Sequence, residues 1–310
     1  SVGATGFTAT VADQVSVVAG DTVVLDNAEL AAGALTATAS LGDLSVKYAV
    51  ITATKDGVTL TAEAADIDAS SAKLTVKDEL TLTAQQSITA TDANVTSNSL
   101  TMTANTGSVE ASRLTATVAD QASVEAGNSV TLDSSKLGLG ALTASAKSSD
   151  LSLTSAEIEV SGAAELTAQD TITATDANVT SDSLTMTAET GSVEASRLIT
   201  IVADQALVEA GDSVTLDNAE LTAGSLTATA TTGVLSVKDA EITTKTGGVT
   251  LTAEAADIDA SCVNLTAVGA ATLTAGQDLK LAPSGDAVAS VTAKSLSATA
   301  GGALDASRLQ

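Results

Sequence analysis

Apolar residues recur in this sequence at a nearly constant step, and that step limits the folds that the chain can adopt. In stretches such as GSVEAS and NSVTLD, one apolar residue follows Ser or Thr, and we take it and its counterparts as anchors. Successive anchors are 21 residues apart, except for steps of 23 residues before Ile67 and Ile258 and of 25 residues before Leu304. The anchors are Val2, Val23, Leu44, Ile67, Ile88, Val109, Val130, Leu151, Ile172, Val193, Val214, Leu235, Ile258, Leu279 and Leu304. A step of this length is typical of chains built from stacked repeats.

Between the anchors, apolar and polar residues alternate with a period of two. In Leu100–Ala104, Leu, Met and Ala fall on one face and the two Thr on the other, as in a half-buried strand. Thr, Val, Ser and Gly are abundant and no period of 3.6 residues is sustained, which disfavours helices. We therefore predict an all-β fold: a single elongated parallel β-helix (β-solenoid) of about 15 coils, with about 21 residues and three short strands per coil.

Long segments of the sequence are copies of one another. Ser99–Leu137 returns 84 residues later as Ser183–Leu221, with 30 of 39 positions identical. Leu235–Ser261 matches Leu44–Ser70 at an offset of 191 residues, and the middle of the chain lacks one coil of that type. The copies define approximate cassettes 1–107, 108–191 and 192–310. We expect one solenoid without a linker, because a linear stack tolerates the gain or loss of whole coils.

The composition agrees with narrow stacked strands and excludes several partners. Aromatic residues make up 1% of the chain, so the core must consist of small and β-branched side chains. The formal charge of −25 argues against nucleic acid as a partner, and no apolar run is long enough for membrane insertion. The single Cys rules out an internal disulfide framework, and the single Pro, Pro283, predicts a turn that bulges away from the stack.

Repeats of about twenty residues with LTLTA, SITA and ANVTS segments, rich in Ala, Thr and Gly, resemble the haemagglutinin-type repeats of filamentous haemagglutinin-like bacterial surface proteins. The resemblance extends over nearly the whole chain. It implies a right-handed parallel β-helix in an extended fibre, with export through an outer-membrane partner. It also implies an extracellular or cell-surface location on a bacterium, an adhesin-like role, and a host or cell-surface receptor as a partner.

All three Arg residues of the chain lie in one motif, and we expect two of them to join acidic coils. The motif reads Glu-Ala-Ser-Arg at Arg113 and Arg197, and Asp-Ala-Ser-Arg at Arg308. We predict a structural Asp–Arg–Asp ladder along the stack, in which each exposed ion pair contributes little to stability. The ladder consists of Asp92, Arg113 and Asp133 in one copy and of Asp176, Arg197 and Asp217 in the other.

Acidic turns that stack along a solenoid are also candidate Ca²⁺ sites, since hard cations prefer carboxylate and carbonyl oxygens. The candidate ligands are Asp13, Asp120 and Asp204 in the VADQ turns, together with Asp66, Asp68, Asp257 and Asp259. The sequence has neither the GGxGxD repeat of Ca²⁺-binding β-rolls nor an EF-hand loop. We therefore prefer solvated acidic turns and expect no cofactor, with Ca²⁺ as the alternative.

Pairs of Thr separated by one residue occupy exposed positions of several predicted strands. In several coils a third apolar position lies twelve residues after the anchor and is filled by Leu35, Leu100, Leu142, Leu184, Leu226 and Val291. The Thr pairs are Thr36/Thr38, Thr101/Thr103, Thr185/Thr187 and Thr227/Thr229, with Thr143/Ser145 as a variant. Flat Thr arrays on β-solenoids look like the ice-binding faces of antifreeze proteins. These pairs skip several coils, however, and Thr is a common residue in exposed strands.

These observations favour a structural rod or fibre segment over an enzyme. Without His and with one Cys, the chain has no Ser–His–Asp set, no Cys–His pair and no zinc cluster. The alternatives are an ice-binding β-solenoid and a carbohydrate-active β-helix protein, which would use paired carboxylates. Neither terminus carries a distinct polar cap, so we expect either continuation of a longer chain, which we prefer, or end-to-end self-association.

Overall fold

The computed structural model describes residues 1–281 and 289–307, so Pro283 and Arg308 lie outside the described residues. The chain consists of two compact units, and each is described by itself. Unit 1 comprises Ser1–Ser152 and Glu157–Val160, and unit 2 comprises Leu153–Ala156 and Ser161–Gln310. The division falls inside the cassette 108–191, so the sequence copies and the compact units have different boundaries.

Unit 1 repeats one order of strands, coil after coil. The first strand of each coil has two residues and begins at an anchor: β1 (Val2–Gly3), β4 (Val23–Val24), β7 (Leu44–Ser45), β10 (Ile67–Asp68), β13 (Ile88–Thr89), β16 (Val109–Glu110), β18 (Val130–Thr131) and β20 (Leu151–Ser152). The second strands are β2 (Thr8–Thr10), β5 (Glu29–Ala32), β8 (Val50–Ala53), β11 (Lys73–Val76), β14 (Asn94–Ser97) and β21 (Glu157–Val160). The third strands are β3 (Gln14–Ala19), β6 (Ala34–Ala39), β9 (Val58–Ala62), β12 (Glu79–Ala84) and β15 (Ser99–Ala104).

Unit 2 follows the same order. Its first strands are β23 (Ile172–Thr173), β26 (Val193–Glu194), β29 (Val214–Thr215), β32 (Leu235–Ser236), β35 (Ile258–Asp259), β38 (Leu279–Lys280) and β41 (Leu304–Asp305). Its second strands are β24 (Asn178–Ser181), β27 (Ile199–Val202), β30 (Glu220–Ala223), β33 (Glu241–Thr244), β36 (Asn264–Ala267) and β39 (Ser290–Thr292). Its third strands are β22 (Ala163–Ala168), β25 (Ser183–Ala188), β28 (Gln205–Ala210), β31 (Ser225–Ala230), β34 (Val249–Ala253), β37 (Ala270–Ala275) and β40 (Ser295–Ala300).

The predicted all-β solenoid with three strands per coil is confirmed, with one variation. In two coils of unit 1 the second and third strands merge into β17 (Thr115–Ala126) and β19 (Lys136–Ala146). Ranges 1–281 and 289–307 contain no helix, and hence none that is long and apolar enough to cross a membrane.

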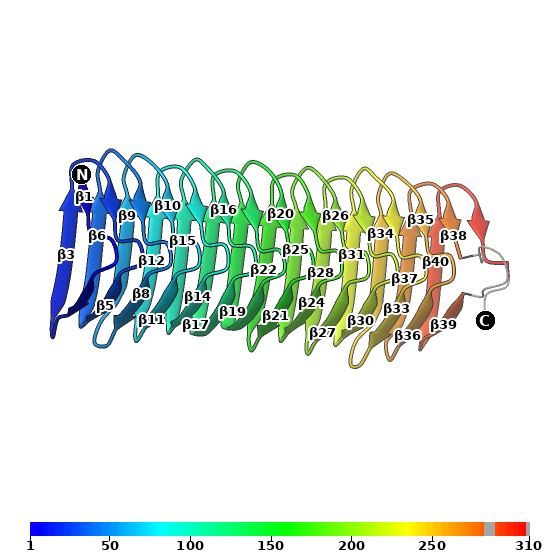
Figure 1. Cartoon of the computed structure of the whole chain (residues 1–310). Coiled ribbons are helices and arrows are strands. Elements are labelled where there is room, and N and C mark those ends of the chain that lie inside the picture. Colours follow the sequence, from blue (N-terminus) through cyan, green and yellow to red (C-terminus); the bar gives the residue numbers. More distant parts are fainter. Residues whose placement is uncertain (282–288, 308–310) are drawn as a thin grey trace. The chain divides into compact units, whose positions relative to one another are not determined.

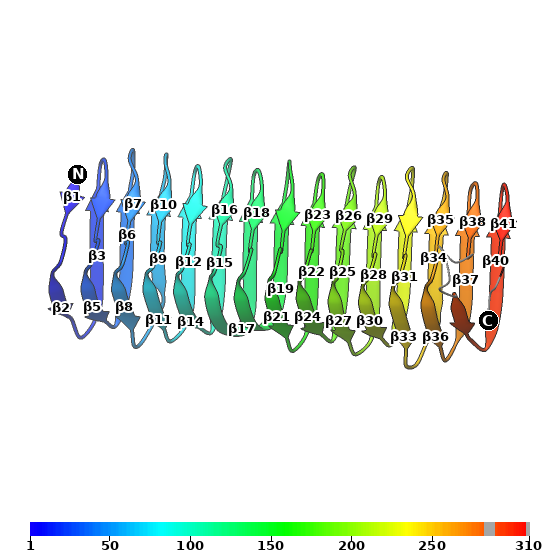
Figure 2. The same ribbon diagram turned by 45° about the vertical axis from the view of Figure 1, so that its right-hand side comes forward.

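Strands of equal rank pair in parallel from one coil to the next. Ile67 lies beside Ile88, Leu74 beside Val95, and Leu82 beside Met102. Figure 1 shows β8, β11 and β14 side by side, and the same order can be followed in Figure 2. Backbone hydrogen bonds join first strands to first strands, second to second and third to third along the stack. Each coil therefore satisfies the backbone N–H and C=O groups at the edge of the neighbouring coil.

The core of each unit lies inside the coils. Residues that alternate along each strand point inward: in β15, Leu100, Met102 and Ala104 are at most 2% exposed, whereas the Thr residues between them are partly exposed. The anchors from Val23 to Leu279 are buried, as the period predicts. Burial of a Leu or Ile side chain contributes roughly 1.5–3 kcal/mol, so this alternating face supplies most of the stabilisation of a coil.

The loop between the second and third strands varies in length and absorbs the two steps of 23 residues. It runs from Ala53 to Val58 in one coil, from Val76 to Glu79 in the next and from Ser97 to Ser99 in the third. The distance of twelve residues from anchor to third strand was predicted for several coils, and it is right for Leu35, Leu100, Leu142, Leu184 and Leu226. It misplaces Val291, which lies in the second strand β39 beside Leu265.

Candidate functional site

The residue four positions after each anchor from Val2 to Ile258 has a left-handed backbone conformation, and we call this set the turn column. Gly6 has a φ of 63°, and the other members have φ values between 54° and 61°. The non-glycine members are Asn27, Tyr48, Ser71, Asp92, Arg113, Ser134, Ser155, Asp176, Arg197, Asn218, Asp239 and Cys262. Only some of them are Gly, Asn or Asp, the residues that tolerate this conformation best.

A tight β-turn after the first strand imposes this conformation. The amide of Ala28 donates to the carbonyl of Leu25 at 3.3 Å, and Ala93 donates to Ala90 at the same distance. A positive φ at the third residue of such a turn is the signature of a type II turn. The turn column therefore belongs to the path of the coil, and its side chains are stacked one coil apart.

Both described Arg residues of the Ala-Ser-Arg motif lie in the turn column, each one coil after an Asp. Arg113 donates from Nε and Nη2 to the two carboxylate oxygens of Asp92, at 2.6 and 2.7 Å. Arg197 makes the same bonds to Asp176, at 2.5 and 2.6 Å. The hydrogen bonds from Arg hold the pKa of Asp92 and of Asp176 below the ordinary range. Two parallel bonds fix the orientation of both side chains.

The predicted ladder does not continue through the turn column to Asp133 and Asp217. The next members after Arg113 and Arg197 are Ser134 and Asn218, because Asp133 and Asp217 follow the arginines by 20 residues instead of 21. Asp133 meets Arg113 through its backbone, since its carbonyl accepts from the Arg113 amide at 2.8 Å. The structure therefore brings each Arg together with the preceding Asp carboxylate.

Asp133 and Asp217 instead belong to a second motif, which sequence analysis missed. The Asp133 carboxylate accepts from the Ser152 hydroxyl at 2.6 Å. The Asp217 carboxylate accepts from the Ser236 hydroxyl at 2.6 Å and from the Lys238 amide at 2.9 Å. Asp26 is bound in the same way by Ser45 and by the Lys47 amide. The sequence does contain a signal for this motif: in each of the three cases a Leu-Asp pair precedes a Leu-Ser pair of the next coil by 19 residues.

Two of the Ca²⁺ candidates, Asp68 and Asp259, are paired with lysine. The Nζ atom of Lys47 lies 2.6 Å from Asp68, and that of Lys238 lies 3.2 Å from Asp259. Burial opposes ionisation of Asp68, but hydrogen bonds from Lys47 and Ser70 outweigh it, so the pKa of Asp68 lies below its ordinary value. For Asp259, burial is likewise outweighed by hydrogen bonds from Ser261 and Lys238, and its pKa is also lowered.

The other Ca²⁺ candidates are dispersed. Asp66 accepts from the Ser87 amide at 2.6 Å and Asp257 from the Asp278 amide at 2.9 Å, so both tie one coil to the next. Asp13 pairs with Lys55 at 2.6 Å, whereas Asp120 is exposed within β17 and Asp204 is exposed in the loop between β27 and β28. Within ranges 1–281 and 289–307, no group of three or more His, Cys, Asp or Glu residues is placed to hold a metal ion.

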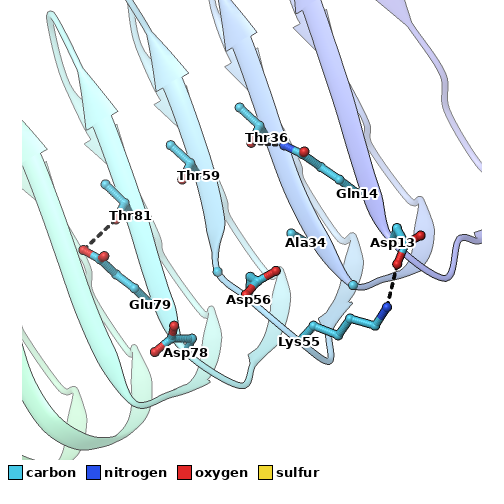
Figure 3. A pocket seen from close by; sticks show the side chains of 12 residues that line it. Asp13, Gln14, Ala34, Thr36, Lys55, Asp56, Thr59, Asp78, Glu79 and Thr81 are labelled. Carbon is cyan, nitrogen blue, oxygen red and sulfur yellow. Dashed lines mark hydrogen bonds and ion pairs between the residues drawn. The ribbon is translucent and has the colours of Figure 1, made fainter.

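A groove of about 420 Å³ opens in unit 1 where the loops between second and third strands are longest. Figure 3 shows Lys55, Asp56, Asp78 and Glu79 along its rim. The groove has no aromatic lining residue. At the offset of 191 residues, unit 2 has neutral residues in these places: Thr246, Gly247, Gly269 and Ala270. These four charges are therefore specific to unit 1, whereas Asp13, which also lines the groove, has the counterpart Asp204 in unit 2.

Over four consecutive coils in each unit, hydroxyl residues form two columns on the third strands without the gaps expected from sequence. In unit 1 the paired columns run over four consecutive coils: Thr36/Thr38, Thr59/Thr61, Thr81/Thr83 and Thr101/Thr103. In unit 2 they run through Thr227/Thr229, Thr250/Thr252 and Thr272/Thr274 to Ser297/Thr299. Figure 3 shows Thr36, Thr59 and Thr81 on adjacent strands. We call each set a Thr array.

No family model, curated protein or solved structure matches the chain. Its class is therefore defined by its own geometry, as a parallel β-solenoid with a turn column, Asp-based links between coils and Thr arrays.

Proposed function

We propose that this chain is a structural segment of a bacterial cell-surface or secreted filamentous protein, similar in kind to the haemagglutinin-repeat adhesins. The coil-to-coil pairing carries the proposal. Within each unit, first strands pair with first strands, second with second and third with third, always in parallel. Such pairing extends a protein by whole coils without altering the core, so the useful property of the chain is its extent.

The side chains that link the coils support a structural role. Asp66, Asp217 and Asp257 each use a carboxylate oxygen to accept a backbone N–H from the following coil. Hydrogen bonds to charged groups are among the stronger ones in proteins. These three acidic residues therefore contribute to coil stacking.

The proposal assigns no catalytic activity to the chain. The rim of the groove in unit 1 is exposed and without aromatic side chains, whereas carbohydrate-active clefts use aromatic faces to hold sugar rings. Incubation of the purified chain with polysaccharides should release no reducing sugar or unsaturated product. Release that is lost in the D78N and E79Q variants would instead favour the carbohydrate-active alternative.

Location is tested on intact cells of the organism that carries this chain. An antibody against the purified chain should label unpermeabilised cells or the culture medium, and external protease should remove the cell-bound signal. Labelling that requires cell lysis would contradict a surface or secreted location.

Stacking on further coils of the same kind is the partner interaction that we propose. In unit 2, Leu296 of β40 is 41% exposed, whereas its neighbour Ala271 of β37 is fully buried. Another coil, from a longer chain or a second copy, would cover this edge. Sedimentation should detect concentration-dependent association of the chain, reduced in L296K and retained in L296I. A chain that stays monomeric at all concentrations would exclude association between copies.

A further inference from the structure

The Thr arrays are regular in two directions. Along a strand, paired Thr residues are two residues apart, which corresponds to about 6.6 Å, and neighbouring strands lie about 4.8 Å apart. The pairing places Thr59 between Thr36 and Thr81, and Thr61 between Thr38 and Thr83. Each array is therefore a grid of hydroxyl and methyl groups, fixed by the backbone hydrogen bonds of the sheet beneath it.

The arrays are also uncharged, in a chain whose formal charge is −25. The same two columns carry acids in neighbouring coils: Glu125 lies beside Thr103, Glu165 beside Thr185, and Glu209 beside Thr187. The fold thus accepts carboxylates at these positions, and packing does not require Thr there. The neutral grid over consecutive coils is a property of the surface.

We propose that the Thr arrays bind ice. Ice holds its water molecules at fixed repeating positions, whereas liquid water does not, so a rigid periodic grid can distinguish the two. A single hydroxyl contributes only about 0.5–1.5 kcal/mol through a hydrogen bond, because liquid water offers competing bonds. Once one Thr of the array contacts ice, the other Thr residues are already placed against the same ice lattice. Their combined binding free energy therefore exceeds that of any single contact.

The methyl groups contribute to the same contact. Each Thr presents a methyl beside its hydroxyl, and water next to a methyl is restricted in orientation. A charged side chain would instead hold a strongly solvated shell at the surface. The array of unit 2 has fewer acids at its rim than that of unit 1, since Gly247, Gly269 and Ala270 stand in place of Asp56, Asp78 and Glu79, although Lys245 stands in place of Thr54. The inference does not depend on the structural role proposed above.

The test uses a double variant of the full chain, T61E/T252E, which we call the array variant. It places one carboxylate in the middle of each Thr array. Glu125 and Glu209 occupy the same column, so the variant should keep its circular dichroism spectrum and melting temperature. The control is the double variant T75E/T243E, which adds the same two carboxylates on second strands, outside the Thr arrays. The column of Thr75 already holds a carboxylate at Glu159.

The measurements are thermal hysteresis and the shape of ice crystals grown in the protein solution. The unmodified chain and the control should depress the freezing point below the melting point, and the array variant should match buffer alone. A T61S/T252S variant, which removes two methyl groups, should lie between them. The proposal is overturned if the unmodified chain does not affect ice growth, or if the control loses as much activity as the array variant. Self-association that only the array variant loses would assign the surface to a second copy and also overturn ice binding.

Discussion

Arg113 and Asp92 face one another across a single coil spacing, both from left-handed backbone positions, and share two parallel hydrogen bonds. Arg197 and Asp176 repeat this arrangement. The motif thus places Arg in a backbone conformation that Asp tolerates but Arg does not favour. The bidentate geometry, which Lys cannot reproduce, accounts for the use of Arg.

Replacing Arg113 by Ala should lower the melting temperature by an amount that depends on salt. The pair is exposed, so added salt screens its attraction, and the loss should be larger at low ionic strength than at high. A double-mutant cycle with D92A isolates the pair. An equal loss at all salt concentrations would show that Arg113 acts through packing instead of charge.

Replacing Asp68 and Asp259 by Asn should flatten the acid side of the stability profile. The folded-state pKa of each carboxyl lies below its ordinary value of 3.8, so the folded state favours the ionised form. Their contribution is complete above the unfolded pKa and is lost as pH falls through the folded pKa. Urea unfolding from pH 7 to pH 2 measures this. A double variant with the slope of the unmodified chain would contradict the assignment.

Replacing Tyr48 by Asn should stabilise the chain by about 0.5–1 kcal/mol, because left-handed backbone costs ordinary residues roughly 1–2 kcal/mol and Asn less. Tyr48 is exposed, so little packing is lost. The matched variant N27A, in the same column, should be destabilising. Denaturant unfolding of both variants provides the comparison, and a less stable Tyr48→Asn variant would imply that the Tyr ring has a role of its own.

Replacing Asp217 by Ala should cost about 1–3 kcal/mol, because the Ser236 hydroxyl and the Lys238 amide lose their acceptor. S236A removes one of the two bonds and should cost less. D26A tests the equivalent motif in unit 1, where Ser45 and the Lys47 amide are the donors. Equal losses from D217A and S236A would assign the effect to the hydroxyl alone.

The coil was predictable because its signals are local and repeated. An anchor such as Ile88 and the alternation of Leu100, Met102 and Ala104 define strand ranks and inward faces without reference to any distant residue. The pairing of Arg113 with Asp92 was also accessible, since both residues lie the same distance after their anchors. Asp133 was assigned to the ladder although its distance from its anchor is one residue shorter.

The positions that sequence analysis misjudged depend on loops of variable length. Thr59 and Thr81 follow their anchors by different distances, so a fixed offset did not align them with Thr36 and Thr101. The turn column escaped notice because residues as different as Tyr48, Arg113 and Cys262 adopt one backbone conformation there.

The sequence alone determined the period, the parallel β-solenoid and the composition of its core, because every second residue of a strand is apolar and stacked coils bury all of these residues on one face. Tertiary structure decided which outward residues become neighbours. Backbone hydrogen bonds between coils set the register strand by strand, and the loops absorb the differences in spacing. The Asp92–Arg113 pair, the Asp217–Ser236 link and the Thr arrays all arise from that register.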